Sequence, residues 1–314
     1  MGVKLHHLVF LLACWVPSVA FPEGVICPPA PDQVVVNVSA SLRFDVSVQA
    51  YVYAYAVKNE PSSVQAVETF AVDVASPVSR IAGPAGWRGR RMDTRPWVKW
   101  AALQVADPDH VTNDASVPPS TVQIKPGSTL AGFSFQSPKP PGLAAFHASG
   151  FVQFPRATGS TPAEAELRAE QLAERIEREC PKLARPLIDQ GVTGPTVGPV
   201  DATPIHIDLK PGEEPNAVNP RSQGVVPLAI LGSATLDARA IDAGTIQLVP
   251  SGAAPRDAGR VEDVNGDGRP DLLLHFSTPA IGLRCGDTTV VLGARTRGGA
   301  RLAGFDSVET PGCR

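Results

Sequence analysis

The chain has 314 residues and a formal net charge of -3, with acidic and basic residues mixed along its length. This charge pattern lacks the basic patch with which proteins bind nucleic acid or an anionic membrane. Proline (32 residues) and glycine (28 residues) are abundant and aromatic residues make up only 6% of the chain, which is typical of short strands joined by many turns. The length allows two domains of ordinary size.

Residues 1–20 have the pattern of a secretory signal peptide. A basic start at Lys4 precedes an apolar run at residues 8–13, and small residues precede the expected cleavage site. No later segment reaches the roughly 20 continuous apolar residues of a membrane helix. Residues 11–14 also resemble a lipoprotein cleavage box, in which Cys14 would carry a lipid. We expect a secreted, cell-surface or periplasmic protein without a transmembrane segment.

The mature chain keeps four cysteines, Cys27, Cys180, Cys285 and Cys313. An even number of cysteines in an oxidising compartment predicts two disulfides, although four cysteines allow three pairings. Cys27 and Cys180 bracket the first half of the chain, whereas the other two lie in the second half. Their positions therefore favour the pairs Cys27–Cys180 and Cys285–Cys313. Metal binding is the alternative, but no CxxC spacing supports it.

The first half, residues 21–180, has the apolar pattern of strands. Apolar residues, among them Phe44, Val46 and Val48, alternate with polar residues and then tyrosines as far as Ala56, which predicts one long strand. The apolar residues form its core face, and the opposite face changes from polar residues to a tyrosine stripe. Turn residues bound further predicted strands at residues 69–74, 97–103, 121–124, 129–135 and 146–154. Such short strands predict an antiparallel β-sandwich.

One amphipathic helix is predicted at about residues 161–180. Thr161 is its expected N-cap, Pro162 takes the first helical position and Glu164 completes a capping box. Its apolar residues share one narrow face: Ala165, Ala169, Leu172, Ile176 and Cys180. We expect this helix to close the first domain and to aim Cys180 at the core.

Residues 181–203 are rich in proline and glycine and are predicted to form a semi-rigid linker. A second strand-rich domain is predicted at residues 204–314, with strands near 205–209, 224–231, 245–249, 260–264, 272–276, 288–292 and 302–308. The fold class is therefore mostly β, with two antiparallel sandwich-like domains.

A calcium-binding loop is predicted at residues 263–271. Side-chain oxygens stand at loop positions one, three, five and nine, with a main-chain carbonyl at position seven, as in an EF-hand; the residues are Asp263, Asn265, Asp267, Asp271 and, for the carbonyl, Arg269. Position twelve is Leu274 instead of a bidentate glutamate, and the flanking residues read as strands. These departures favour a structural calcium ion over a signalling switch. An acidic hairpin turn without a metal is the alternative.

Three segments of the second half resemble a C-terminal calcium-loop domain that recurs in secreted proteins of environmental bacteria. They are residues 207–231, with Ile207-Asp-Leu-Lys-Pro-Gly212, residues 262–276 around the loop, and Cys285-Gly-Asp287. The resemblance implies an extracellular calcium-binding β module with no assigned activity. The first half resembles bacterial immunoglobulin-like surface modules only in its loose pattern.

No sequence motif of a known catalytic class occurs, so we expect a non-catalytic module for binding, adhesion or matrix structure. Its partner would be an extracellular polysaccharide or a surface protein. The alternative is a secreted hydrolase or a carbohydrate-binding accessory protein, and its candidate residues are Asp107, Asp109, His110, Asp114 and His275, with Trp87, Trp97, Trp100 and the tyrosine stripe as a sugar-stacking face. A polar loop, a packed strand histidine and a sandwich core are the plainer interpretations of these residues.

Overall fold

The computed structural model describes residues 27–75, 77–103, 121–153, 161–182 and 190–313. The predicted signal peptide, Cys14 and the predicted acidic cluster at residues 107–114 lie outside these ranges. No helix of the described part is long and apolar enough to cross a membrane.

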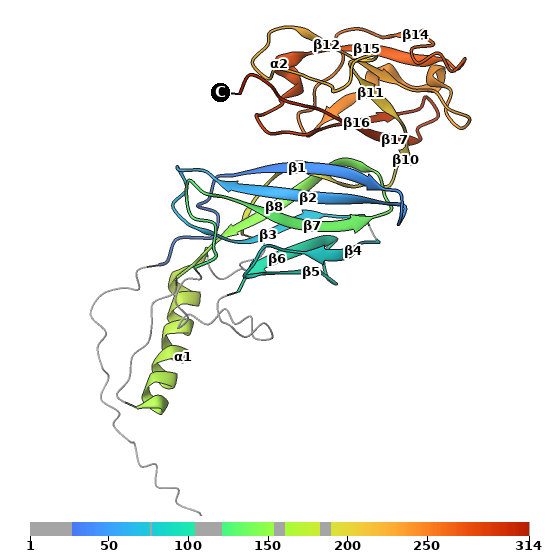
Figure 1. Ribbon diagram of the computed structural model, residues 1–314. Coiled ribbons are helices and arrows are strands. Elements are labelled where there is room, and N and C mark those ends of the chain that lie inside the picture. Colours follow the sequence, from blue (N-terminus) through green and yellow to red (C-terminus); the bar gives the residue numbers. More distant parts are fainter. Residues whose placement is uncertain (1–26, 76, 104–120, 154–160, 183–189, 314) are drawn as a thin grey trace, which may run out of the picture.

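The first half of the chain is a β-sandwich of two antiparallel sheets (Figure 1). One sheet has the order β1-β2-β7-β4, formed by Val36–Asp45, Ala50–Asn59, Thr129–Ser137 and Ser79–Ala82. The other has the order β5-β6-β3-β8-β9, formed by Trp87–Arg91, Trp97–Ala102, Val67–Asp73, Pro141–Gly150 and Val192–Pro199. The mostly β prediction is confirmed.

The core of this sandwich is aromatic, and the tyrosine stripe of β2 faces into it. Tyr53, Phe70, Trp100, Phe133 and Phe135 are fully buried and contact one another. Buried hydroxyl and indole groups still need hydrogen-bond partners. The Tyr53 hydroxyl accordingly donates to a main-chain carbonyl at 2.7 Å, and the Trp100 indole N–H does the same at 2.7 Å.

The predicted strand from Phe44 to Ala56 is instead a hairpin. β1 ends at Asp45 and β2 starts at Ala50, and the two strands pair in register around this turn. The prediction that Phe44, Val46 and Val48 face the core is therefore wrong, because these side chains are exposed.

The second half of the chain is a smaller sandwich. One sheet has the order β10-β17-β16-β13, formed by Thr203–Pro204, Arg301–Ser307, Thr289–Arg295 and Gln247–Val249, and its β10–β17 pair is parallel. The other, antiparallel sheet has the order β11-β12-β15-β14, formed by Ile207–Leu209, Val225–Ile230, Asp271–Ser277 and Arg260–Glu262. Short helices at Ala238–Ala240, Ala243–Thr245 and Thr278–Ile281 (α2) connect these strands.

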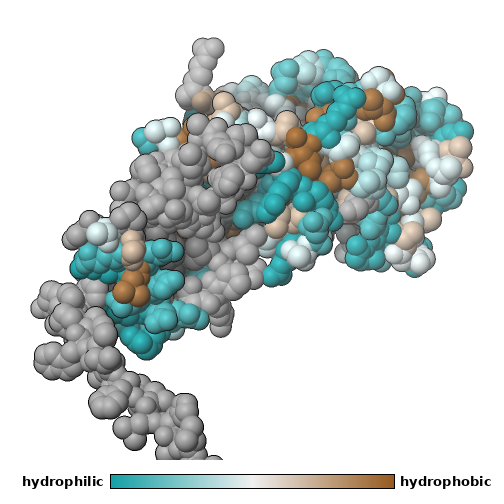
Figure 2. Space-filling view, turned by 90° about the horizontal axis from the view of Figure 1, so that it is seen from below, coloured by the Kyte–Doolittle hydropathy of each residue, from teal (hydrophilic) through white to brown (hydrophobic). Residues whose placement is uncertain are grey.

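The predicted helix is α1, Pro162–Glu179, and it begins as expected because Thr161 accepts a hydrogen bond from the Glu164 N–H at 3.3 Å. It does not close the sandwich. Figure 1 shows it extending away from the sheets, and Leu172 and Ile176 are only half-buried. Small hydrophobic patches surrounded by hydrophilic residues mark the visible surface, including the part at the left of Figure 2.

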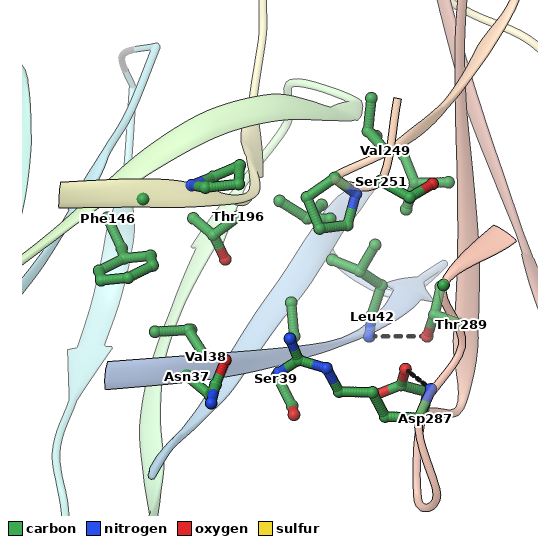
Figure 3. Close-up of a pocket in the computed structure, with 18 of the residues that line it drawn as sticks. Asn37, Val38, Ser39, Leu42, Phe146, Thr196, Val249, Ser251, Asp287 and Thr289 are labelled. Atoms are coloured by element: carbon green, nitrogen blue, oxygen red, sulfur yellow. Dashed lines mark hydrogen bonds between the residues drawn. The ribbon is translucent and has the colours of Figure 1, made fainter. Parts of the chain in front are cut away.

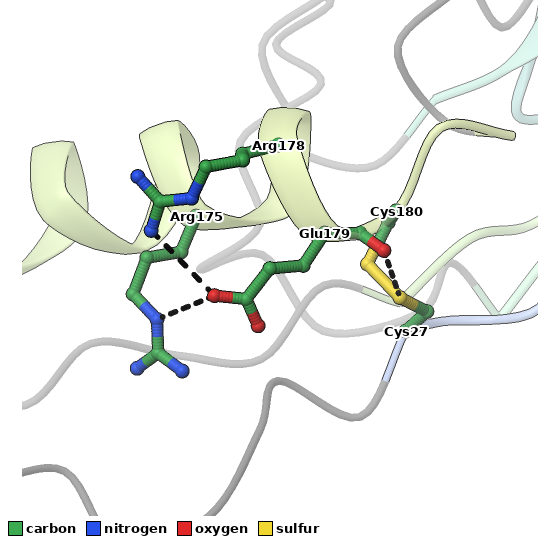
Figure 4. The surroundings of a disulfide bond; sticks show 5 residues. All are labelled: Cys27, Arg175, Arg178, Glu179 and Cys180. Carbon is green, nitrogen blue, oxygen red and sulfur yellow. Dashed lines mark hydrogen bonds and ion pairs between the residues drawn. A yellow bond between two sulfur atoms is a disulfide. The ribbon is translucent and has the colours of Figure 1, made fainter.

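Both predicted disulfides are confirmed. Cys27 bonds Cys180, the buried residue that ends α1, and Cys285 bonds Cys313 within the second sandwich. Figure 4 shows the first bond beside Glu179, whose carboxylate accepts from the Arg175 guanidinium at 3.2 Å. The disulfide therefore ties the start of the described chain to the end of its longest helix.

Part of the predicted linker is a strand. Val192–Pro199 form β9, which pairs with β8 from Ala148↔Val192 to Pro141↔Pro199. Proline is tolerated there because β9 is the outermost strand of its sheet and needs no hydrogen-bond donor on its free side. The first sandwich therefore extends to Pro199. Whether each half folds independently stays a prediction.

The two sandwiches pack together through β16. Val290 and Leu292 point into the core of the second sandwich, whereas Val291 belongs to the core of the first. Val249 and Phe305 flank Val291 on the neighbouring strands, and the ring of Phe305 lies 5.9 Å from the ring of Tyr51. One sheet of the second sandwich thus contributes apolar side chains to both cores.

Candidate calcium loop

The predicted calcium loop connects β14 to β15 at one edge of the second sandwich. The two strands are antiparallel, and Glu262 pairs with Asp271 at the base of the loop. The flanking segments are therefore strands, as predicted from the sequence, and not the helices of an EF-hand.

The loop folds around the carboxylate of Asp263. One oxygen of this carboxylate accepts hydrogen bonds from the main-chain N–H groups of Gly266 and Asp267, at 2.8 and 3.1 Å. The other accepts from the Gly268 N–H at 2.9 Å. Gly266 and Gly268 have φ angles of 76° and 80°, which glycine adopts without steric cost. Asp263 thus holds the turn in a tight curl.

The next acidic and amide side chains cap main-chain groups of the same turn. The Asn265 side-chain oxygen accepts from the Asp267 N–H at 3.0 Å, and one Asp267 oxygen accepts from the Arg269 N–H at 2.9 Å. The other Asp267 oxygen lies 3.9 Å from the guanidinium of Arg269. Asp263, Asn265 and Asp267 are all exposed, so solvent ions reach them freely.

Asp271 has different surroundings, because its side chain is fully buried. One carboxylate oxygen accepts from the Gly232 N–H at 2.7 Å and the other from the Val264 N–H at 2.8 Å. The first bond joins the base of the loop to the segment after β12, and the second joins the two ends of the loop. The geometry makes Asp271 an anchor of the loop, and its predicted role as a calcium ligand stays a prediction.

The donor chemistry of the loop fits a hard cation. Calcium takes oxygen ligands only, and the exposed turn offers them from Asp263, Asn265 and Asp267 and from the Arg269 carbonyl. Each carboxylate keeps free lone pairs after accepting main-chain bonds. Within the described ranges, however, no three His, Cys, Asp or Glu side chains gather into a metal-binding group. The loop therefore combines two exposed carboxylates with neutral oxygens.

The residues of the alternative functions that lie within the described ranges do not form a comparable site. Trp87, Trp97 and Trp100 are buried, so they offer no exposed face for stacking on a sugar ring. His275 is partly exposed and its ring nitrogen lies 2.8 Å from a carboxylate oxygen of Asp257. His275 lies on β15, whereas Asp257 lies in the segment before β14.

Comparisons with known proteins do not assign a family. No protein-family model matches the chain, and no curated protein sequence matches it. A solved structure of an uncharacterised protein from Nocardia farcinica with an immunoglobulin-like fold is similar at 22% identity and a TM-score of 0.24. That similarity covers 40% of this chain and 91% of the other.

Proposed function

We propose that this chain is an extracytoplasmic, non-catalytic binding or structural module whose second sandwich is stabilised by one calcium ion. The observation that carries the calcium proposal is the curl of the loop around Asp263, which leaves oxygen atoms of three exposed side chains on one turn. Two disulfides support an oxidising location outside the cytoplasm.

The ligands in this proposal are Asp263, Asn265, Asp267 and the Arg269 carbonyl, and Asp271 fixes the loop that presents them. A bound divalent cation would offset the repulsion between the exposed carboxylates and would leave the main-chain bonds in place. With few charged ligands, we expect an affinity on the order of 10⁻⁴–10⁻³ M, as in extracellular modules.

Thermal unfolding of the full mature protein in calcium and in chelator tests this proposal. Calcium at a hundredfold excess over its dissociation constant should add about 2.7 kcal/mol to the free energy of unfolding. Asp267→Ala should remove most of this response. Asp93→Ala is the matched control, because Asp93 is an exposed aspartate of the first half and should leave the response unchanged.

Titration calorimetry gives a second, direct measurement of calcium binding. Identical melting curves in calcium and chelator, together with no heat of binding, would show that the loop is only a turn. N-terminal analysis of the exported protein tests the location: a chain starting at Phe21 supports the signal peptide, and a lipid on Cys14 supports the lipoprotein alternative.

A further inference from the structure

A cavity of about 530 Å³ lies where the two sandwiches meet (Figure 3). β1 contributes five consecutive residues to its wall, 36–40, and β9 contributes another five, 193–197. The second sandwich closes the cavity with residues around β13, α2 and β16. The face of a strand would contribute only alternate residues, because successive side chains point in opposite directions. The cavity is therefore lined by the edges of two strands.

The main-chain groups of β1 on the cavity side have no partner strand. β1 and β9 are the outermost strands of their sheets. The main-chain N–H of Leu42 points away from β2 and donates to the Thr289 hydroxyl at 3.3 Å. The odd-numbered Val35 instead faces β2, because its main-chain carbonyl accepts from the Glu60 N–H, just after β2, at 2.8 Å. Since N–H and C=O directions alternate along a strand, those of Val38 and Ala40 point to the same edge as Leu42. No hydrogen bond within the described ranges pairs them.

The two edges differ in their ability to accept another strand. β9 carries Pro195 and Pro199, which lack the N–H that a ladder requires. Residues 36–42 of β1 contain neither proline nor a charged side chain, although natural edge strands commonly use both as protection. β1 is therefore the edge on which a strand can be added.

A buried hydroxyl on the opposite wall also lacks a partner. The Thr196 side chain on β9 is only 1% exposed, and its oxygen has no hydrogen-bond partner. Figure 3 shows this hydroxyl turned toward β1. Leaving such a group unpaired costs about 1–3 kcal/mol.

We propose that β1 binds an extended segment of a partner polypeptide, which adds to its free edge as a further strand. The available stretch, residues 36–40, is about 13 Å long and matches four or five residues of an added strand. The ionisable residues lining the cavity are Arg284 and Asp287, of opposite charge, so the segment that fits is uncharged. This inference rests on the proposed binding role but uses a site separate from the calcium loop.

The probe is a phage-displayed library of random heptapeptides, selected on the full mature protein with its disulfides intact. The strongest clone is synthesised in its plain form and with alternate main-chain nitrogens methylated. Ala40→Pro removes only an outward N–H and leaves the β1–β2 ladder in place, because proline is tolerated on the free side of an edge strand. Ala40→Val keeps this N–H and is the matched control.

We expect the plain peptide to bind and to slow hydrogen exchange at the amides of Val38 and Ala40. Ala40→Pro and peptide methylation should each weaken binding about tenfold, and Ala40→Val should not. If Ala40→Pro fails to fold, the methylated peptide decides the result.

Failure to select a peptide, equal binding to Ala40→Pro, or equal binding of the methylated peptide would overturn the proposal. So would ultracentrifugation showing that a second copy of the chain occupies this edge, or a glycan array showing that only oligosaccharides bind there. The melting response to calcium is measured on the same samples, so failure of peptide binding and failure of the calcium proposal give different results.

Discussion

Val291→Ala tests whether the two sandwiches stabilise each other. Val291 is 2% exposed and lies on the face of β16 that joins the core of the first sandwich. The substitution removes the equivalent of two buried methylene groups, which costs about 1.6 kcal/mol in transfer free energy. The cavity that remains raises the expected loss of stability to about 2–3 kcal/mol.

Tryptophan fluorescence measures this effect in the half of the chain that is not mutated. The tryptophans of the described ranges, Trp87, Trp97 and Trp100, all lie in the first sandwich, and Trp15 belongs to the predicted signal peptide. If Val291 stabilises the first sandwich across the interface, the fluorescence-detected melting temperature should fall by about 4–12 °C. Far-UV circular dichroism follows the unfolding of both halves.

Val290→Ala is the matched control, because Val290 is 3% exposed and points from the same strand into the core of the second sandwich. We expect it to affect mainly the transition detected by circular dichroism. A fluorescence transition that is identical in the wild type and in Val291→Ala would refute the coupling and would favour two independent units.

Replacing both Cys285 and Cys313 by serine opens a loop with a sequence separation of 28 and should cost about 3.6 kcal/mol in the chain-entropy model, so an unchanged melting temperature would contradict that model here. Asp271→Ala leaves two main-chain N–H groups unpaired at the loop base and should cost at least about 2 kcal/mol in calcium and in chelator alike. A loss seen only with calcium would instead identify Asp271 as a ligand. Burial and two neighbouring carboxylates raise the pKa of Asp208 above its unfolded value. Ionisation of Asp208 therefore lowers the stability of the folded state as the pH rises from the unfolded pKa through the folded pKa. Asp208→Asn removes this loss, so it should raise the melting temperature at pH 7 but not at a pH below the unfolded pKa. Melting curves across this pH range check the sign.

Local sequence signals predicted several features correctly. The capping residues of α1 marked its first turn because they act within four residues of one another. The pairing of Cys27 with Cys180 and of Cys285 with Cys313 followed from their positions in the two halves. The strands on either side of the candidate calcium loop were also predicted.

Local sequence patterns did not reveal the features that depend on tertiary contacts. The turn between β1 and β2 was hidden because Val46 and Val48 continue the apolar alternation, and because Gln49 adopts a positive φ of 51° without being a glycine. The prolines of β9 predict a linker, because proline is acceptable in a sheet only on the free side of an edge strand. The amphipathic pattern of α1 likewise gave no information on whether the sandwich would cover it.

The position of β9 also sets an order of events during synthesis. A ribosome delivers the chain from its N-terminus, and domains generally fold as they emerge. The sheet containing β8 cannot gain its last strand until Pro199 is available, and Cys27 cannot form its bond until the chain reaches Cys180. The first sandwich therefore stays incomplete, with the edge of β8 unpaired, until more than half of the chain has been synthesised. We expect this nascent state to be the form of the protein most dependent on chaperones.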